Sequence, residues 1–111
     1  MIEFQMTDWS AIPQTVHKGE VGEAFWKTIQ YEGLRVRMVE CSPGYIADHW
    51  CTKGHIIYCI EGEMVNMLST GEEQVMKAGM TYQVSDNASS HKTRTDKGVK
   101  LFIIDGDFLA K

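Results

Sequence analysis

The chain has 111 residues, a length that suits one domain with a hydrophobic core of its own. Hydrophobic residues make up 43% of the chain, which excludes a disordered polar polypeptide. The formal net charge of −4 provides no basic surface for nucleic acid or for an anionic membrane, so we expect neither as a partner.

The first ten residues contain Glu3 and Asp8 and have no basic start followed by an apolar run, which argues against a secretory signal. No stretch reaches the roughly 18 apolar residues of a membrane span, and we expect a cytoplasmic protein. The number of cysteines is odd, which disfavours a disulfide framework. Cys41 and Cys59 lie in apolar runs and are predicted to be small buried hydrophobic residues.

Short apolar runs separated by evenly spaced turn signals predict an all-β sandwich or barrel. Residues 1–23 are predicted to form an N-terminal arm or edge segment, with a helical turn within 7–12 and with His17 on the surface. Residues 24–111 are predicted to form the barrel domain and to end in a helical turn within 105–111. Its strands are expected at 24–31, 34–41, 45–50, 55–60, 64–68, 73–77, 81–84, 91–95 and 99–105.

Two of these strands differ in their patterns. The strand at 34–41 alternates apolar residues with Arg35 and Arg37, which is typical of a sheet with one wet face. We interpret the arginines as solvated, although they would bind a substrate carboxylate if their face lined a cavity. The strand at 99–105 has apolar residues on both faces, so both faces are expected to be covered. The second face is covered either by the other half of the sandwich or by a second copy of the chain.

Three of the four histidines accompany one cysteine in a pattern that indicates a metal site. His49 and Cys51 are two residues apart, and on a strand such residues share a face. His55 follows a chain reversal at 52–54, and His91 opens a later strand. Imidazole nitrogen and thiolate sulfur are ligands for late first-row divalent metals. The spacing matches no zinc finger, and a single histidine is usually a surface or core residue, so spacing alone does not establish the site.

The region 34–105 also resembles the cupin superfamily through two motifs. Where the first cupin motif has a glycine, two histidines, a glutamate and a glycine, this chain has Gly44, His49, Cys51, His55 and Gly62. Where the second has a glycine, a proline, a glycine, a histidine and an asparagine, this chain has Gly79, Ser85, Asn87, His91 and Thr95. The stretch 48–51 reads Asp-His-Trp-Cys and resembles the DHCW-motif cupin fold proteins. The resemblance implies a small single-domain cupin, a jelly-roll barrel or double-stranded β-helix.

The departures from the motifs are informative. Cys51 replaces a metal-binding histidine and His55 replaces the metal-binding glutamate, so the set still carries three imidazoles and one negative charge. Ser85 and Asn87 replace the proline and glycine of the second motif, a mild change because Asn tolerates the left-handed backbone conformation.

The resemblance implies one divalent transition metal bound by His49, Cys51, His55 and His91. The soft thiolate favours zinc as the bound metal, and iron, nickel or copper are the next candidates. Four protein ligands that leave no open coordination position would make the site structural. A fifth coordination position, open to water or substrate, would make it catalytic or substrate-binding. If Cys51 is not a ligand, it is a free reactive thiol beside three histidines.

Three tyrosines are candidates for lining the barrel cavity, although core packing is the alternative for each. They are Tyr45, Tyr58 and Tyr82.

The sequence leaves several uses of such a site open: a metal-dependent enzyme on a small molecule, a non-catalytic ligand-binding or sensor module, and a structural zinc barrel. We expect a metal-binding small-molecule cupin whose reaction is undetermined. We also expect a homodimer, because the N-terminal arm and the apolar strand at 99–104 provide surfaces that a second copy of the chain would bind.

Overall fold

A computed structural model of the chain describes residues 2–110; Met1 and Lys111, the outer ends of the predicted arm and barrel, lie outside the described residues. The fold is almost entirely β, as predicted. The elements are η1 (Trp9–Ala11), β1 (Gln14–Lys18), β2 (Glu23–Tyr31), β3 (Leu34–Cys41), β4 (His55–Leu68), β5 (Glu73–Lys77), β6 (Thr81–Val84), β7 (His91–Arg94), β8 (Val99–Gly106) and η2 (Asp107–Leu109). The two 3-10 turns lie within the segments predicted to hold a helical turn.

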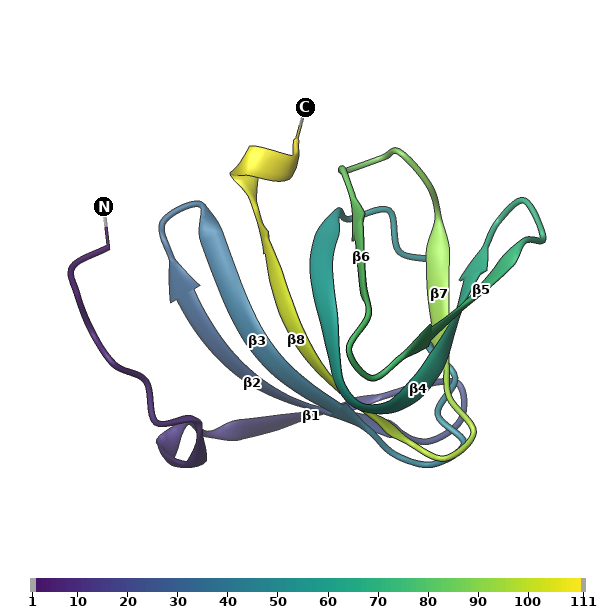
Figure 1. The fold of residues 1–111 in the computed structure, drawn as a ribbon, viewed down its shortest axis with the longest axis horizontal. Helices are drawn as coiled ribbons and strands as arrows, with labels where there is room; N and C mark the ends of the chain where they lie inside the picture. Colours follow the sequence, from purple (N-terminus) through teal and green to yellow (C-terminus); the bar gives the residue numbers. More distant parts are fainter. Residues whose placement is uncertain (1, 111) are drawn as a thin grey trace.

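All strand pairs are antiparallel, and the strands follow the order β1-β2-β3-β8-β4-β5, with β6 and β7 each paired to β4. Figure 1 shows the resulting layers bent toward each other, with the β6–β7 connection and the C-terminal turn at the same end. β1 lies at the edge of the sheet and pairs only with β2 among the described strands.

β4 belongs to both layers. Its first half pairs with β6 and β8, and its second half pairs with β5 and β7. A register shift between Cys59 and Glu61, followed by Gly62 at φ 83°, bends the strand where it changes layer. The prediction of two strands, 55–60 and 64–68, was therefore wrong: Glu61-Gly62 is a bulge inside one strand rather than a chain reversal.

The predicted strand at 45–50 is also absent from the structure. Only single bridges occur here, from Ile46 to Val21 and Arg94 and from Cys51 to His91. The apolar residues of this segment predicted a strand, but Pro43 and Gly44 (φ 81°) open it as a turn and no neighbouring strand pairs with it continuously. Alternation of side chains between two faces consequently does not apply to it.

The core lies between the layers, on the face shared by alternate residues of β2, β3, β4 and β8. The register places Ala24 opposite Cys41 and Val39 opposite Leu101 on that face. Cys41 and Cys59 are buried there as free thiols, as predicted. The buried apolar set is Ala24, Val39, Cys41, Ile57, Cys59, Met64, Met76, Val99, Leu101 and Ile103.

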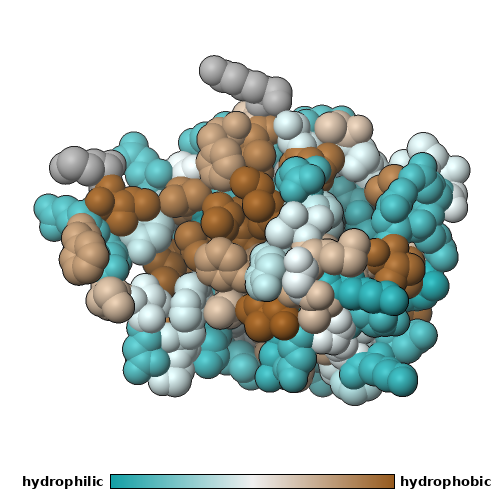
Figure 2. Space-filling view, viewed as in Figure 1, coloured by the Kyte–Doolittle hydropathy of each residue, from teal (hydrophilic) through white to brown (hydrophobic). Residues whose placement is uncertain are grey.

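The outer surface of the protein carries both apolar and hydrophilic side chains. Figure 2 shows one face on which apolar side chains gather in the middle, with hydrophilic side chains around them. Within residues 2–110, no helix has the length and apolar character that crossing a membrane requires.

Candidate metal centre

The structure brings together three of the four predicted metal ligands. Cys51, His55 and His91 each offer one ligand atom, and these atoms lie within 4.8 Å of one another. The backbones of Cys51 and His91 exchange two hydrogen bonds, with N···O distances of 2.8 and 2.9 Å, so the two residues are held directly opposite each other. His55 reaches the same point as the first residue of β4.

The turn before His55 is fixed by the β6–β7 connection. The Gly54 N–H donates to Asp86 Oδ1 at 2.6 Å, and the Asn87 N–H donates to the Thr52 carbonyl at 2.8 Å. A Cβ at Gly54 would lie 2.5 Å from the Val84 carbonyl oxygen, so a side chain does not fit there. Asn87 has a φ of 61°, which confirms that this position uses the left-handed conformation. The second motif thus holds the first motif in place.

His55 is oriented from behind by Asp105. The His55 Nδ1 and Asp105 Oδ2 are 3.0 Å apart, and both residues are buried. A proton on Nδ1 donates to this carboxylate, which leaves Nε2 as the nitrogen that faces Cys51 Sγ at 3.6 Å. Metal-bound histidines are commonly held by a carboxylate in this way.

Asp105 is itself held by two arginines. It accepts hydrogen bonds from Arg35 Nε and Nη2 at 2.8 and 2.9 Å and from Arg37 Nη2 at 2.9 Å. Burial alone would raise the pKa of Asp105, but the hydrogen bonds from His55 and Arg35 and the charge of Arg37 outweigh burial and hold that pKa below its usual range. The carboxylate is therefore ionised at neutral pH and is the acceptor for the Nδ1 proton of His55.

Cys51 is activated by its neighbours. The hydrogen bond with His55, and then the proximity of His91, lower the pKa of the Cys51 thiol to about 5, although partial burial opposes the change. For His55, burial lowers the pKa, but the contacts with Asp105 and Cys51 outweigh burial and raise it above its usual value. A thiolate ready at neutral pH is the form that binds a metal.

His91 provides an independent indication of a metal. The residue is 3% exposed, and neither Nδ1 nor Nε2 has a hydrogen-bond partner within residues 2–110. Its ring lies edge-on to His55 with the centroids 5.4 Å apart. Buried imidazoles almost always have a partner, and a metal ion beside Cys51 and His55 would supply one. The donor set of one thiolate and two imidazoles fits a divalent transition metal.

His49 is not brought into this group. Its side chain is 75% exposed, and its Nδ1 lies 2.6 Å from Asp48 Oδ1. The argument that placed His49 and Cys51 on one face required a strand, and the chain makes only isolated bridges here. His49 does line the rim of the neighbouring cavity, so its role as a fourth ligand stays a prediction.

A cavity of about 260 Å³ adjoins the three donors between the sheet layers. Tyr45 and Tyr82 line it, whereas Tyr58 points to the outer face of β4 and is 43% exposed. Burial raises the pKa of both cavity tyrosines above the usual value, so their hydroxyl groups stay protonated. Arg35 and Arg37 also line this cavity.

The interpretation of Arg35 and Arg37 as solvated side chains was therefore wrong. Their face of β3 is the inner one, and Arg37 is only 4% exposed. A buried guanidinium requires a partner, which Asp105 supplies from β8. Alternation on β3 was predicted correctly, but which face was inside was not.

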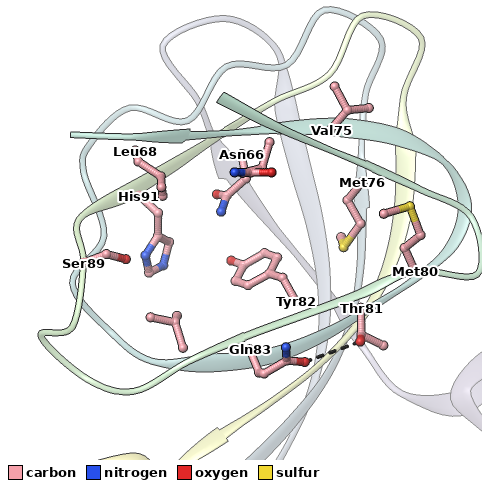
Figure 3. A pocket seen from close by; sticks show the side chains of 12 residues that line it. Asn66, Leu68, Val75, Met76, Met80, Thr81, Tyr82, Gln83, Ser89 and His91 are labelled. Atoms are coloured by element: carbon pink, nitrogen blue, oxygen red, sulfur yellow. Dashed lines mark hydrogen bonds between the residues drawn. The ribbon is translucent and has the colours of Figure 1, made fainter. Parts of the chain in front are cut away.

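A second cavity of about 330 Å³ lies on the other side of His91 and Tyr82, which line both. Figure 3 shows these side chains and Asn66 directed into it, with Met76 and Met80 on one side. Asn66 is 8% exposed, and its Oδ1 has no hydrogen-bond partner in the described part of the chain.

Sequence reasoning missed Asp105 and Trp26 as parts of the site. Asp105 directly follows the apolar run 101–104 near the end of β8, and a charged residue in that place is the one signal that could have indicated it. Trp26 lies with its ring centroid 4.4 Å from Arg37 Cζ, across β2 and β3. No local pattern connects Trp26 with Arg37.

Comparison with solved structures identifies the fold. The RmlC-like cupin from Shewanella frigidimarina is 15% identical, with a TM-score of 0.73 over 94% of this chain and 91% of that one. Ectoine synthase from P. lautus is 17% identical, with a TM-score of 0.77 over 93% and 78%. A predicted oxalate decarboxylase from Thermotoga maritima is 16% identical, with a TM-score of 0.76 over 92% and 98%. No family model and no curated protein sequence matches the chain.

The chain therefore has the fold of a small cupin, as the two motifs implied. At these identities the likeness shows the fold alone. The resemblance to the DHCW-motif proteins rests on residues 48–51 only.

Proposed function

We propose that the protein binds one divalent transition metal through Cys51, His55 and His91 and uses it to hold a small molecule in the adjoining cavity. The observation that carries this proposal is the convergence of three donor atoms within 4.8 Å, two of them on buried histidines, at the wall of a cavity of about 260 Å³. Zinc is the metal that a thiolate and two imidazoles favour, with iron, nickel or copper next.

Each residue of the candidate site has a distinct role in the proposed function. Cys51 would supply its sulfur and His55 and His91 one ring nitrogen each, while Asp105 fixes the ring of His55 from behind. A bound metal would act as a Lewis acid toward an oxygen of the small molecule. Tyr45 and Tyr82 keep their protons and can donate hydrogen bonds into the cavity. Ectoine synthase, a structure of the same fold, is named as an enzyme, which supports catalysis as one use of such a cavity.

A structural zinc barrel is the alternative function, and one observation weighs against it. A closed structural site needs four protein ligands. The fourth predicted ligand, His49, has an exposed side chain that contacts Asp48 instead. Three grouped donors beside a cavity support an open metal site.

Metal content tests the proposal. The untagged protein is purified as wild type, Cys51→Ser, His91→Ala and the control Cys41→Ala, and metal is measured by mass spectrometry. We expect about one metal ion per chain in the wild type and the control, and loss or exchange of the metal in the two site variants. Full retention in Cys51→Ser would leave the histidines as the binding set. A wild type without metal, even after reconstitution, would overturn the proposal.

A further inference from the structure

We propose that the cavity beside the candidate metal centre is a site for small organic anions, in which Arg37 binds the carboxylate or phosphate group. The inference rests on the proposed function, because it takes this cavity as the place where the small molecule is held. It adds the chemical class of that molecule and the residue that selects it.

Arg37 has an unused donor inside the protein. Its guanidinium donates from Nη2 to Asp105 and lies against the ring of Trp26, but its Nε has no acceptor within residues 2–110. The side chain is about nineteen-twentieths buried and lines the cavity. An unpaired buried donor on a charged group is unfavourable, and an acceptor on a ligand in the cavity that Arg37 lines would satisfy this donor once the side chain turns toward the ligand.

The charged side chains that line the cavity also support an anionic ligand. Four cationic side chains line it, and no Asp or Glu does so in the described part of the chain; the four are Arg35, Arg37, Lys53 and Lys92. Asp105 lies behind the two arginines and compensates one of their two charges. Lys53 and Lys92 pair outward with Asp86 and Glu20 at 3.8 and 3.3 Å. One guanidinium charge is thus left without a carboxylate partner. The Cys51 thiolate, which also lines the cavity, balances that charge in the metal-free protein, and a divalent metal bound to the thiolate would make the cavity electropositive.

The size of the cavity restricts the class further. Its volume of about 260 Å³ is below the range of roughly 300–1,000 Å³ that is usual for drug-sized ligands. A guanidinium group recognises carboxylate and phosphate oxygens through charge-assisted hydrogen bonds. Malonate and inorganic phosphate are therefore suitable probes of the two anion chemistries.

The test is calorimetric titration of the full-length protein with malonate and with phosphate, at constant ionic strength maintained with chloride. Each titration is made on the protein as purified and again after metal removal and dialysis. We compare the wild type with Arg37→Met and with the control Arg94→Met, whose guanidinium pairs with Glu73 on the surface. Arg37→Lys serves as a second variant, because it keeps a charge for Asp105 and removes only the planar donor.

We expect the wild type to bind at least one of the two probes. The affinity should fall at least about tenfold in Arg37→Met and in Arg37→Lys and less than about twofold in Arg94→Met. If Arg37→Met does not fold, Arg37→Lys decides. The inference is overturned if neither anion binds the wild type, or if Arg37→Lys binds as tightly as the wild type. A parallel zinc titration separates the two proposals: zinc binding without anion binding removes only this inference, and absence of zinc binding removes the proposed function.

Discussion

Asp105 Oδ2 lies 3.0 Å from His55 Nδ1, at the junction of β8 and β4. This contact decides which nitrogen of His55 faces Cys51 and His91. The same carboxylate binds Arg35 and Arg37, so one residue orients a metal donor and anchors the cationic wall of the cavity. Any change at Asp105 should therefore affect both stability and metal binding.

Asp105→Asn tests this connection. The substitution leaves Arg37 and Arg35 without a counter-charge, and breaking a buried ion pair in this way costs about 3–5 kcal/mol. Loss of the carboxylate behind a metal-bound histidine should weaken metal affinity about 10- to 100-fold. Denaturant unfolding and zinc titration measure the two effects. Asp96→Asn, at an exposed residue, should change stability by less than about 0.5 kcal/mol. Equal effects of the two variants would contradict the role of Asp105.

Cys51 should be reactive in the metal-free protein at unusually low pH. Its pKa of about 5 lies well below the ordinary 9.0, so the thiolate forms as the pH rises through 5. Alkylation by iodoacetamide, followed by mass spectrometry across pH 4–9, should give a midpoint near 5. Cys41, whose pKa burial raises to about 12, should not react while the protein is folded. Added zinc should suppress the reaction, and a midpoint near 9 would contradict the prediction.

The same shift has a consequence for stability. Because the folded pKa of Cys51 lies below the unfolded value, the thiolate contributes fully above pH 9 and its contribution is lost as the pH falls through about 5. The free energy of unfolding of the metal-free wild type, relative to Cys51→Ser, should therefore increase from pH 5 to pH 9. A flat difference would show that folding leaves the pKa of the thiol unchanged, and a falling difference would show that folding raises it; either result would contradict the prediction.

His49→Ala distinguishes a three-residue site from the four-residue site that the motif predicts. The exposed side chain of His49 leads us to expect about one metal per chain and a loss of affinity below tenfold in zinc titration. His55→Ala is the matched comparison, because its ring is buried among the donors, and it should lose much more. Equal losses in the two variants would establish His49 as the fourth ligand.

Self-association is predicted to use the outer face of β4 and β8. Ile56 and Tyr58 are 37% and 43% exposed, and they pair with Ile104 and Phe102 on that face. A second copy would cover this apolar strip, and Tyr58→Lys would place a charge in it and favour the monomer. Sedimentation velocity over a range of concentrations measures the effect. Val75→Lys, at an apolar residue that is 49% exposed on β5, should leave the dimer intact. A wild type that is monomeric throughout would contradict the prediction.

The sequence predicted the strands best where turns and alternation agree. Most strands fall within a residue or two of the predicted ranges, because a Gly or Asn turn closes one run before the next begins. It failed at Glu61-Gly62, where a glycine bends a strand without reversing it, and at 45–50, where no partner strand is available. In both places the pairing partner, rather than local composition, determines the conformation.

What the sequence determined by itself was the all-β class, the two cupin-like motifs and the donor types at Cys51, His55 and His91, because residue identity and spacing carry that information. Only the tertiary structure decided that Arg37 is inside the barrel, that Asp105 holds His55, and that His49 lies apart from the other donors. These facts depend on which strands become neighbours: β3 and β8 are far apart in the chain and adjacent in the sheet. A one-residue change of register would reverse every face, and local alternation cannot say which face meets the core.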